Sequence, residues 1–186
     1  FYQYIYMYKL NFDKCKNIEK FNNDMIETFS QFSDNMSTFG ISLGNYSGAA
    51  ILNDGTIAPF GWTHTGGAKP GSVDVTNIKG ISYGELSAGV IRSDNTVVTW
   101  GSVSKGGNSN EVREELKNVV AISMGGEAGA ALRNDGTVVL WGDSNNGGSN
   151  NTNADLTNIK SISMGNKAGA ALKEDGTVVL WGDKSY

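Results

Sequence analysis

The sequence predicts an all-β repeat fold, a β-propeller-like array of four three-stranded units behind an N-terminal helical arm. Three markers recur in one register, which is the usual sign of a repeat architecture. An Ile-Ser-x-Gly tetrad begins at Ile41, Ile81, Ile122 and Ile162, in steps of 40, 41 and 40 residues. An aromatic-Gly pair follows it in all four units, and a Gly-Gly pair follows in the first three, at matching intervals. We expect units at residues 37–76, 77–117, 118–157 and 158–186.

The sequence of each unit predicts three short strands, and the pattern is clearest in the third unit. Val119–Met124 and Thr137–Trp141 are rich in β-branched and aromatic residues, and Ala128–Leu132 between them consists of Gly, Ala and Leu. The small side chains of the middle strand allow neighbouring sheets to approach closely. The third strand is apolar at every position, which is typical of a strand covered on both faces.

An Asp-Gly pair or its equivalent separates the second strand from the third and predicts a tight hairpin. Asn in place of Gly keeps this turn, because Asn enters the left-handed region more easily than other residues with a side chain. The predicted turn residues are Asp54, Gly55, Asp94, Asn95, Asp135, Gly136, Asp175 and Gly176.

One large aromatic residue ends each third strand, and we expect it to fill the space between adjacent sheets. These structural inter-blade residues are Phe60, Trp100, Trp141 and Trp181. The first unit differs from the others because Pro59 lies in its third strand, and Pro is confined to edge strands. Terminal repeats are usually atypical, so residues 37–76 are predicted to form an end blade.

Residues 1–36 do not fit the repeat. Alternating tyrosines at the start favour a strand, and the spacing of Ile18, Phe21, Met25, Phe29 and Phe32 predicts an amphipathic helix over 17–33. This arm either caps the repeat array or docks onto a partner or a second copy. A second short helix, solvated and of mixed charge, is expected over Glu111–Lys117.

The repeat, quoted as Ile-Ser-Met-Gly-x-x-Ala-Gly-Ala-Ala-Leu-x-x-Asp-Gly-Thr-Val-Val-Leu-Trp-Gly, resembles that of the regulator of chromosome condensation family, in its short bacterial-type variant. The propeller-type β-lactamase inhibitory protein is similar. The resemblance covers about residues 37–182 and implies a β-propeller, commonly of seven blades, that serves as a platform for protein contacts. The chain has four units, and it lacks the His that family members often carry before the second strand. The family's nucleotide-exchange activity is not carried over.

The composition argues against several classes of function. The net charge of −4 argues against nucleic-acid binding, and no apolar run is long enough for a transmembrane helix. The single histidine, His64, and the single cysteine, Cys15, provide neither a catalytic arrangement nor a zinc cluster. The Asp-Gly pairs match no calcium loop, and the Gly-Gly pairs match no phosphate-binding loop. We therefore expect no enzyme activity, no cofactor and no metal. The cytosol, a virus particle and a bacterial surface all remain open as compartments.

Two functions remain. The first is a non-enzymatic protein-binding module, because loops that vary on a rigid scaffold are where recognition normally lies. The loops after each aromatic-Gly pair vary most, and we expect them to gather on one rim. The second is a structural subunit of a virus particle or cell surface, completed by other copies or other chains. The candidate partner-binding residues in the loops are Trp62, His64, Lys105, Asn108, Asn145 and Asn146.

Overall fold

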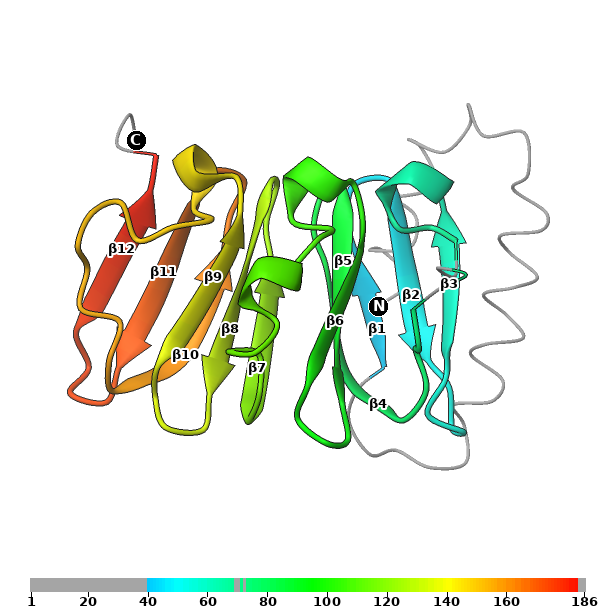
Figure 1. The fold of residues 1–186 in the computed structure, drawn as a ribbon, viewed down its shortest axis with the longest axis horizontal. Coiled ribbons are helices and arrows are strands. Elements are labelled where there is room, and N and C mark those ends of the chain that lie inside the picture. The colour runs from blue at the N-terminus through cyan, green and yellow to red at the C-terminus, as the bar shows by residue number, and fades with distance from the viewer. Residues whose placement is uncertain (1–39, 69–70, 72, 184–186) are drawn as a thin grey trace, which may run out of the picture. The chain divides into compact units, whose positions relative to one another are not determined.

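The computed structural model describes residues 40–68, 71 and 73–183, and the predicted N-terminal arm lies outside this part. The described residues form four three-stranded antiparallel sheets, which confirms the predicted all-β array of blades (Figure 1). In every blade the three strands follow one another in sequence order. Blade 1 contains β1 (Ile41–Leu43), β2 (Ser47–Ile51) and β3 (Ile57–Gly61); blade 2 contains β4 (Ile78–Tyr83), β5 (Ser87–Arg92) and β6 (Val97–Gly101); blade 3 contains β7 (Val119–Met124), β8 (Ala128–Arg133) and β9 (Val138–Gly142); blade 4 contains β10 (Ile159–Met164), β11 (Ala168–Lys173) and β12 (Val178–Gly182).

The blades lie face to face in a row, with blade 1 and blade 4 at opposite ends (Figure 1). The first strands β1, β4, β7 and β10 contact one another in sequence along the row. The second strands also contact the first strand of the following blade. Each blade therefore covers the next, as in a sector of a propeller.

The Ile-Ser-x-Gly tetrad joins consecutive blades through hydrogen bonds. The Ser42 hydroxyl of blade 1 accepts a bond from the Tyr83 N–H of blade 2 at 2.9 Å. Ser82 accepts likewise from Met124 N–H, and Ser123 from Met164 N–H, each at 2.9 Å. These side chains bridge the first strands, where no strand ladder exists.

The glycine of the tetrad permits the same close approach. A Cβ on Gly84 would collide with the carbonyl oxygen of Gly125, which belongs to the next blade. The next residue, Glu85, donates its N–H to that oxygen at 3.1 Å. The blades thus meet backbone to backbone at this point, and only glycine leaves the necessary room.

Three hydrophobic cores lie between the four blades. The core between blades 2 and 3 combines Ile91 and Val97 of the former with Val119, Val139 and Trp141 of the latter. Equivalent clusters join blades 1 and 2 and blades 3 and 4. Burial of apolar surface between blades is the main favourable contribution to such packing.

The linkers between blades also supply core residues, which corrects one expectation. The linker Glu111–Lys117 was expected to form a solvated helix, but only a 3-10 turn, η3 (Asn110–Val112), forms nearby. Leu116 in this linker is 1% exposed and belongs to the core between blades 2 and 3. The linker segment is therefore partly buried, because the wedge between two blades needs apolar filling.

The third strands form one edge of every sheet, so the apolar run is not covered equally at all positions. Pro59 does lie on an edge strand, opposite Ala49. Because β6, β9 and β12 are edge strands as well, proline there does not by itself mark an end blade. In blade 4, Val178 and Leu180 are 60% and 65% exposed, so β12 is covered on one face only.

Candidate functional site

The loops that follow the third strands turn at one edge of the row of blades (Figure 1). Each begins with a 3-10 turn, namely η1 (Thr63–Thr65), η2 (Val103–Lys105) and η4 (Ser144–Asn146). The residue before each turn donates its N–H to the hairpin between the first and second strands, as Trp62 does to the Tyr46 carbonyl at 3.0 Å. We define the loop rim as these turns together with two further residues of each blade. One is the residue in the hairpin between the first and second strands that accepts this bond, and the other, called the post-Gly residue, directly follows the aromatic-Gly pair and donates it. The hairpin residues are Tyr46, Leu86, Glu127 and Lys167, and the post-Gly residues are Trp62, Ser102, Asp143 and Asp183.

Buried tryptophans bond the base of the loops and hold them in position. Trp100, Trp141 and Trp181 are 5%, 4% and 2% exposed, and each belongs to an inter-blade core. Their indole N–H groups donate to the carbonyls of Gly66, Gly106 and Gly147, each at 3.0 Å. Each bond joins the Trp of one blade to the loop that arrives from the previous blade. In blade 1, Phe60 holds the equivalent position at the end of the third strand and is partly buried, but unlike the tryptophans it does not belong to any of the three inter-blade cores.

The recurring Gly-Gly pair explains how the loop accepts this bond. The first glycine of each pair has a positive φ, 87° at Gly106 for example, which turns its carbonyl toward the indole. A residue with a side chain is strained in that conformation. The loops therefore share one rigid base, whatever side chains they carry above it.

An exposed aromatic pair marks the blade 1 end of the loop rim. Tyr46 and Trp62 stack with ring centroids 5.2 Å apart and an interplanar angle of 17°. Trp62 is 59% exposed and Tyr46 is 41% exposed. Val103, in the next turn, is 69% exposed. Such large apolar side chains gathered in solvent are typical of interaction surfaces.

His64 lies in the turn η1, two residues after Trp62. It is exposed and lines an open hollow with Thr63, Trp100 and Ser102. Within the described residues, no group of three or more His, Cys, Asp or Glu side chains is arranged to hold a metal ion. Because both polar and apolar residues line it, the hollow is a contact surface of mixed polarity.

Three polar side chains from separate loops meet over blade 3. The Lys105 ammonium lies 2.5 Å from Glu127 Oε2, and Asn146 donates its side-chain N–H to the same oxygen at 2.8 Å. Lys105 and Asn146 were expected in the candidate surface. Glu127 was not expected to belong to it, because the Gly-Glu-Ala hairpin has no recognisable motif.

The remaining two candidate residues, Asn108 and Asn145, form hydrogen bonds within their own loops. Asn108 Oδ1 accepts the Asn110 N–H at 3.0 Å. Asn145 donates its backbone N–H to Asp143 Oδ1 at 2.9 Å. Both residues are exposed. They help shape their loops, and their remaining polar groups face solvent.

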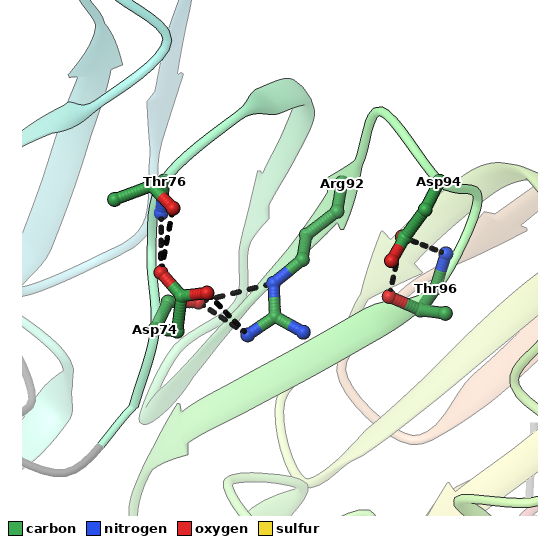
Figure 2. A network of polar contacts seen from close by, with 5 residues as sticks. All are labelled: Asp74, Thr76, Arg92, Asp94 and Thr96. Carbon is green, nitrogen blue, oxygen red and sulfur yellow. Dashed lines mark hydrogen bonds and ion pairs between the residues drawn. The ribbon is translucent and has the colours of Figure 1, made fainter.

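The hairpin turns between second and third strands carry the same arrangement in all four blades. In each, Asp Oδ1 accepts the backbone N–H and the hydroxyl of the Thr two residues later, as at Asp94 and Thr96 (Figure 2). The residue after the Asp has a positive φ at Gly55, Asn95, Gly136 and Gly176. The Asp itself does not, so its contribution is the side-chain bond that closes the turn.

In blades 2 and 4, the basic residue at the end of the second strand bonds the linker that precedes the blade. Arg92 donates to the Asp74 carbonyl at 2.6 Å and pairs with its carboxylate at 3.7 Å (Figure 2). Lys173 instead donates to the side-chain carboxylate of Asp155. The hydrogen bonds from Lys173 and Thr157 lower the pKa of Asp155 from 3.8 to about 2. The Asp–Thr bonds of the hairpin turns repeat from blade to blade, whereas the side chains of the loop rim differ.

Four blades stacked in register, with tryptophan-anchored loops, define a propeller-type repeat protein. Solved propellers share this fold. Yeast RCC1 (Prp20), in a structure bound to Kap60, is 20% identical, with a TM-score of 0.59; the match covers 78% of this chain and 45% of that one. Prp20p from Saccharomyces cerevisiae, in a study of its binding to Gsp1p and histones, gives 18% identity over 80% and 47%, with a TM-score of 0.59. Human WBSCR16 gives 15% over 76% and 46%, with a TM-score of 0.58.

These similarities support an RCC1-like fold, and the chain spans less than half the length of these three solved proteins. No protein-family model matches the sequence. No curated protein matches it either. In the described part of the chain, no helix has the length and hydropathy that a bilayer crossing requires.

Proposed function

We propose that this chain is a non-enzymatic protein-binding module that contacts its partner through the loop rim. This proposal rests on a contrast between two parts of the blades. The base, which is formed by the contacts between blades beneath the loops, repeats along the chain, whereas the loop rim does not. The base repeats with the same Ser, Gly and Trp contacts from blade to blade. The rim residues at equivalent positions differ in every blade, as Tyr46, Leu86, Glu127 and Lys167 do.

Differences on a fixed scaffold favour recognition over a purely structural role. A loop needed only for folding would repeat with the rest of the unit, because every blade meets the same packing requirements. Binding surfaces in repeat proteins usually lie on one face, where the loops differ. The solved structure of yeast RCC1 bound to Kap60 is an example of a propeller with a protein partner.

The chemistry of the rim indicates the kind of partner surface that fits. The Tyr46–Trp62 stack and Val103 provide an apolar contact area at one end. Aromatic residues of this kind supply most of the binding energy at many interfaces. Toward blade 4 the rim becomes charged, with Glu127, Asp143 and the Lys167–Asp183 pair at 3.9 Å. A partner with an apolar side chain beside basic and polar groups would match both ends.

Site-specific photocross-linking tests this proposal in cells of the source organism. A photoreactive side chain replaces Val103 on the rim, or the exposed Asn134 in the hairpin turn of blade 3 as the matched control. We expect a discrete cross-linked protein from position 103 and none from position 134. Equal capture at both positions, or none at position 103, would contradict a rim-specific function.

The captured protein then allows a direct affinity measurement. Trp62→Ala should weaken its binding by about 30-fold, as expected for an aromatic hot spot worth about 2 kcal/mol. Thr177→Ala, which changes only the hairpin turn, serves as the control and should bind like the wild type. Unchanged affinity in Trp62→Ala would show that the apolar end of the rim is not the contact.

A further inference from the structure

The two ends of the row of blades carry complementary faces, and we propose that they meet between two copies of the chain. Blade 4 of one copy would receive blade 1 of the second copy, in the manner in which each blade receives the next within the chain. Two such contacts, related by a two-fold axis, would close a ring of eight blades. This inference concerns the sheet faces and does not rest on the loop-rim proposal.

Each internal junction shows what one blade offers to the next. At the junction of blades 3 and 4, Ser123 Oγ accepts the Met164 N–H at 2.9 Å, and Gly126 donates its N–H to the Gly165 carbonyl at 3.2 Å. Apolar side chains from β8 and β9, including Leu132 and Leu140, pack against blade 4. A receiving face therefore consists of a serine acceptor, a backbone donor and an aliphatic surface.

Blade 4 repeats this receiving face. Ser163 stands where Ser123 does, and the N–H of Asn166 stands where that of Gly126 does. Among the described residues, neither group meets a further blade. Val178 and Leu180 are 60% and 65% exposed, whereas the equivalent residues of blade 3 are partly buried in a core.

The glycines show the same vacancy. A Cβ on Gly136 would lie 3.3 Å from the Cα of Asn158 in the following blade, but a Cβ on Gly176 would meet none of the described residues within 4 Å. A Cβ on Gly125 would collide with the Gly165 carbonyl, whereas one on Gly165 would lie 3.5 Å from the Ala168 carbonyl of its own blade. Within the described part of the chain, nothing fills the volume that a fifth blade would occupy.

Blade 1 presents the matching side. Leu43 stands where Met124 and Met164 do, so its N–H is placed to donate to a serine, and the Gly44 carbonyl is placed to accept. Ile41 and Leu43 are 42% and 50% exposed, while Met124 is 5% exposed under blade 2. The inserting face therefore has the same polar groups and a comparable apolar surface.

A second copy is the occupant that these two faces identify. Blades 1 and 4 lie at opposite ends of the row (Figure 1), so they do not meet within the described part of one chain. The chain spans 45–47% of the yeast RCC1 chains that it matches, and two copies would supply about one such length. A front-to-back contact also has the directionality needed for ring closure. Uncovered sheet faces and edges otherwise favour uncontrolled association.

The solution mass of the 186-residue chain tests the proposal. We expect twice 19.8 kDa, which is 39.6 kDa, by light scattering coupled to gel filtration. Leu180→Asp should weaken each contact by about 30-fold or more and shift the mass to 19.8 kDa. Val103→Asp, an equally exposed apolar position on the loop rim, should remain a dimer. Circular dichroism confirms that both variants fold.

Mixing two variants tests the head-to-tail geometry. Ile41→Asp and Leu180→Asp alone should each be monomeric, since every contact then contains one damaged face. Mixed together, they should form a heterodimer through one contact between two undamaged faces. A dimer of Ile41→Asp alone would indicate a blade 4 to blade 4 contact and overturn the proposal.

Three further results would also overturn it. A monomeric wild type would mean that the N-terminal segment or another protein covers these faces. A dimer that survives Leu180→Asp would place the contact elsewhere. Masses above the dimer would show an open filament in place of a ring. None of these results bears on the loop rim, whose test is partner capture and affinity.

Discussion

Replacement of Trp141 by alanine tests the packing between blades most severely. The indole is 4% exposed and lies in the core between blades 2 and 3. Burial of a Trp side chain removes about 150–250 Å² from water, which corresponds to an upper bound of about 4–6 kcal/mol. Truncations of this size cost about 3–5 kcal/mol in other proteins. The Gly106 carbonyl, 3.0 Å from the indole nitrogen, would also lose its donor. We therefore expect Trp141→Ala to lose about 3–5 kcal/mol of unfolding free energy.

Urea unfolding followed by far-ultraviolet circular dichroism measures this loss without depending on tryptophan fluorescence. Trp62→Ala is the matched control, because Trp62 is 59% exposed. Exposed positions usually change stability by less than about 0.5 kcal/mol. A loss below about 1 kcal/mol in Trp141→Ala, or an equal loss in both variants, would refute the inter-blade role of this residue.

Two further predictions concern the blade junctions and the turns. In the monomeric Leu180→Asp background, Gly125→Ala should cost about 1–3 kcal/mol in urea unfolding, because its Cβ collides with the Gly165 carbonyl, while Gly165→Ala should leave folding nearly unchanged. Similar losses in the two alanine variants would contradict the close approach. Because Asp155 has its pKa lowered from 3.8 to about 2, its carboxylate stabilises the fold above pH 4, and this contribution disappears between about pH 4 and pH 2. Asp155→Asn should lack that part of the acid dependence of the melting temperature, and an unchanged acid profile would argue against the Lys173 contact.

The periodic markers were sufficient to predict the blades, because each marker corresponds to a packing requirement that every blade shares. The same pattern identified the tetrad but not its role. That Ser82 bridges two blades depends on which strands lie side by side, and spacing along the chain does not contain that information. The prediction of a solvated helix over Glu111–Lys117 was wrong for a similar reason. Leu116 lies among Glu, Arg and Lys, so its burial is visible only when the wedge between two blades is known.

The loop rim was predictable in outline but not in detail. Variable loops between repeated strands indicate a recognition surface on general grounds. The polar cluster over blade 3 could not be read from the sequence, because Lys105 and Asn146 lie about 20 residues before and after Glu127, in different loops. The Tyr46–Trp62 stack likewise joins the hairpin between β1 and β2 to the loop after β3. Only the folded register brings these side chains together.

The exchange rates of the four indole N–H protons test the central claim that tryptophans join consecutive blades. A nitrogen-15 correlation spectrum in deuterated water resolves one signal for each Trp of the chain. We predict slow exchange at Trp100, Trp141 and Trp181, whose indoles bond buried glycine carbonyls, and rapid exchange at exposed Trp62. Rapid exchange at all four positions would contradict the account.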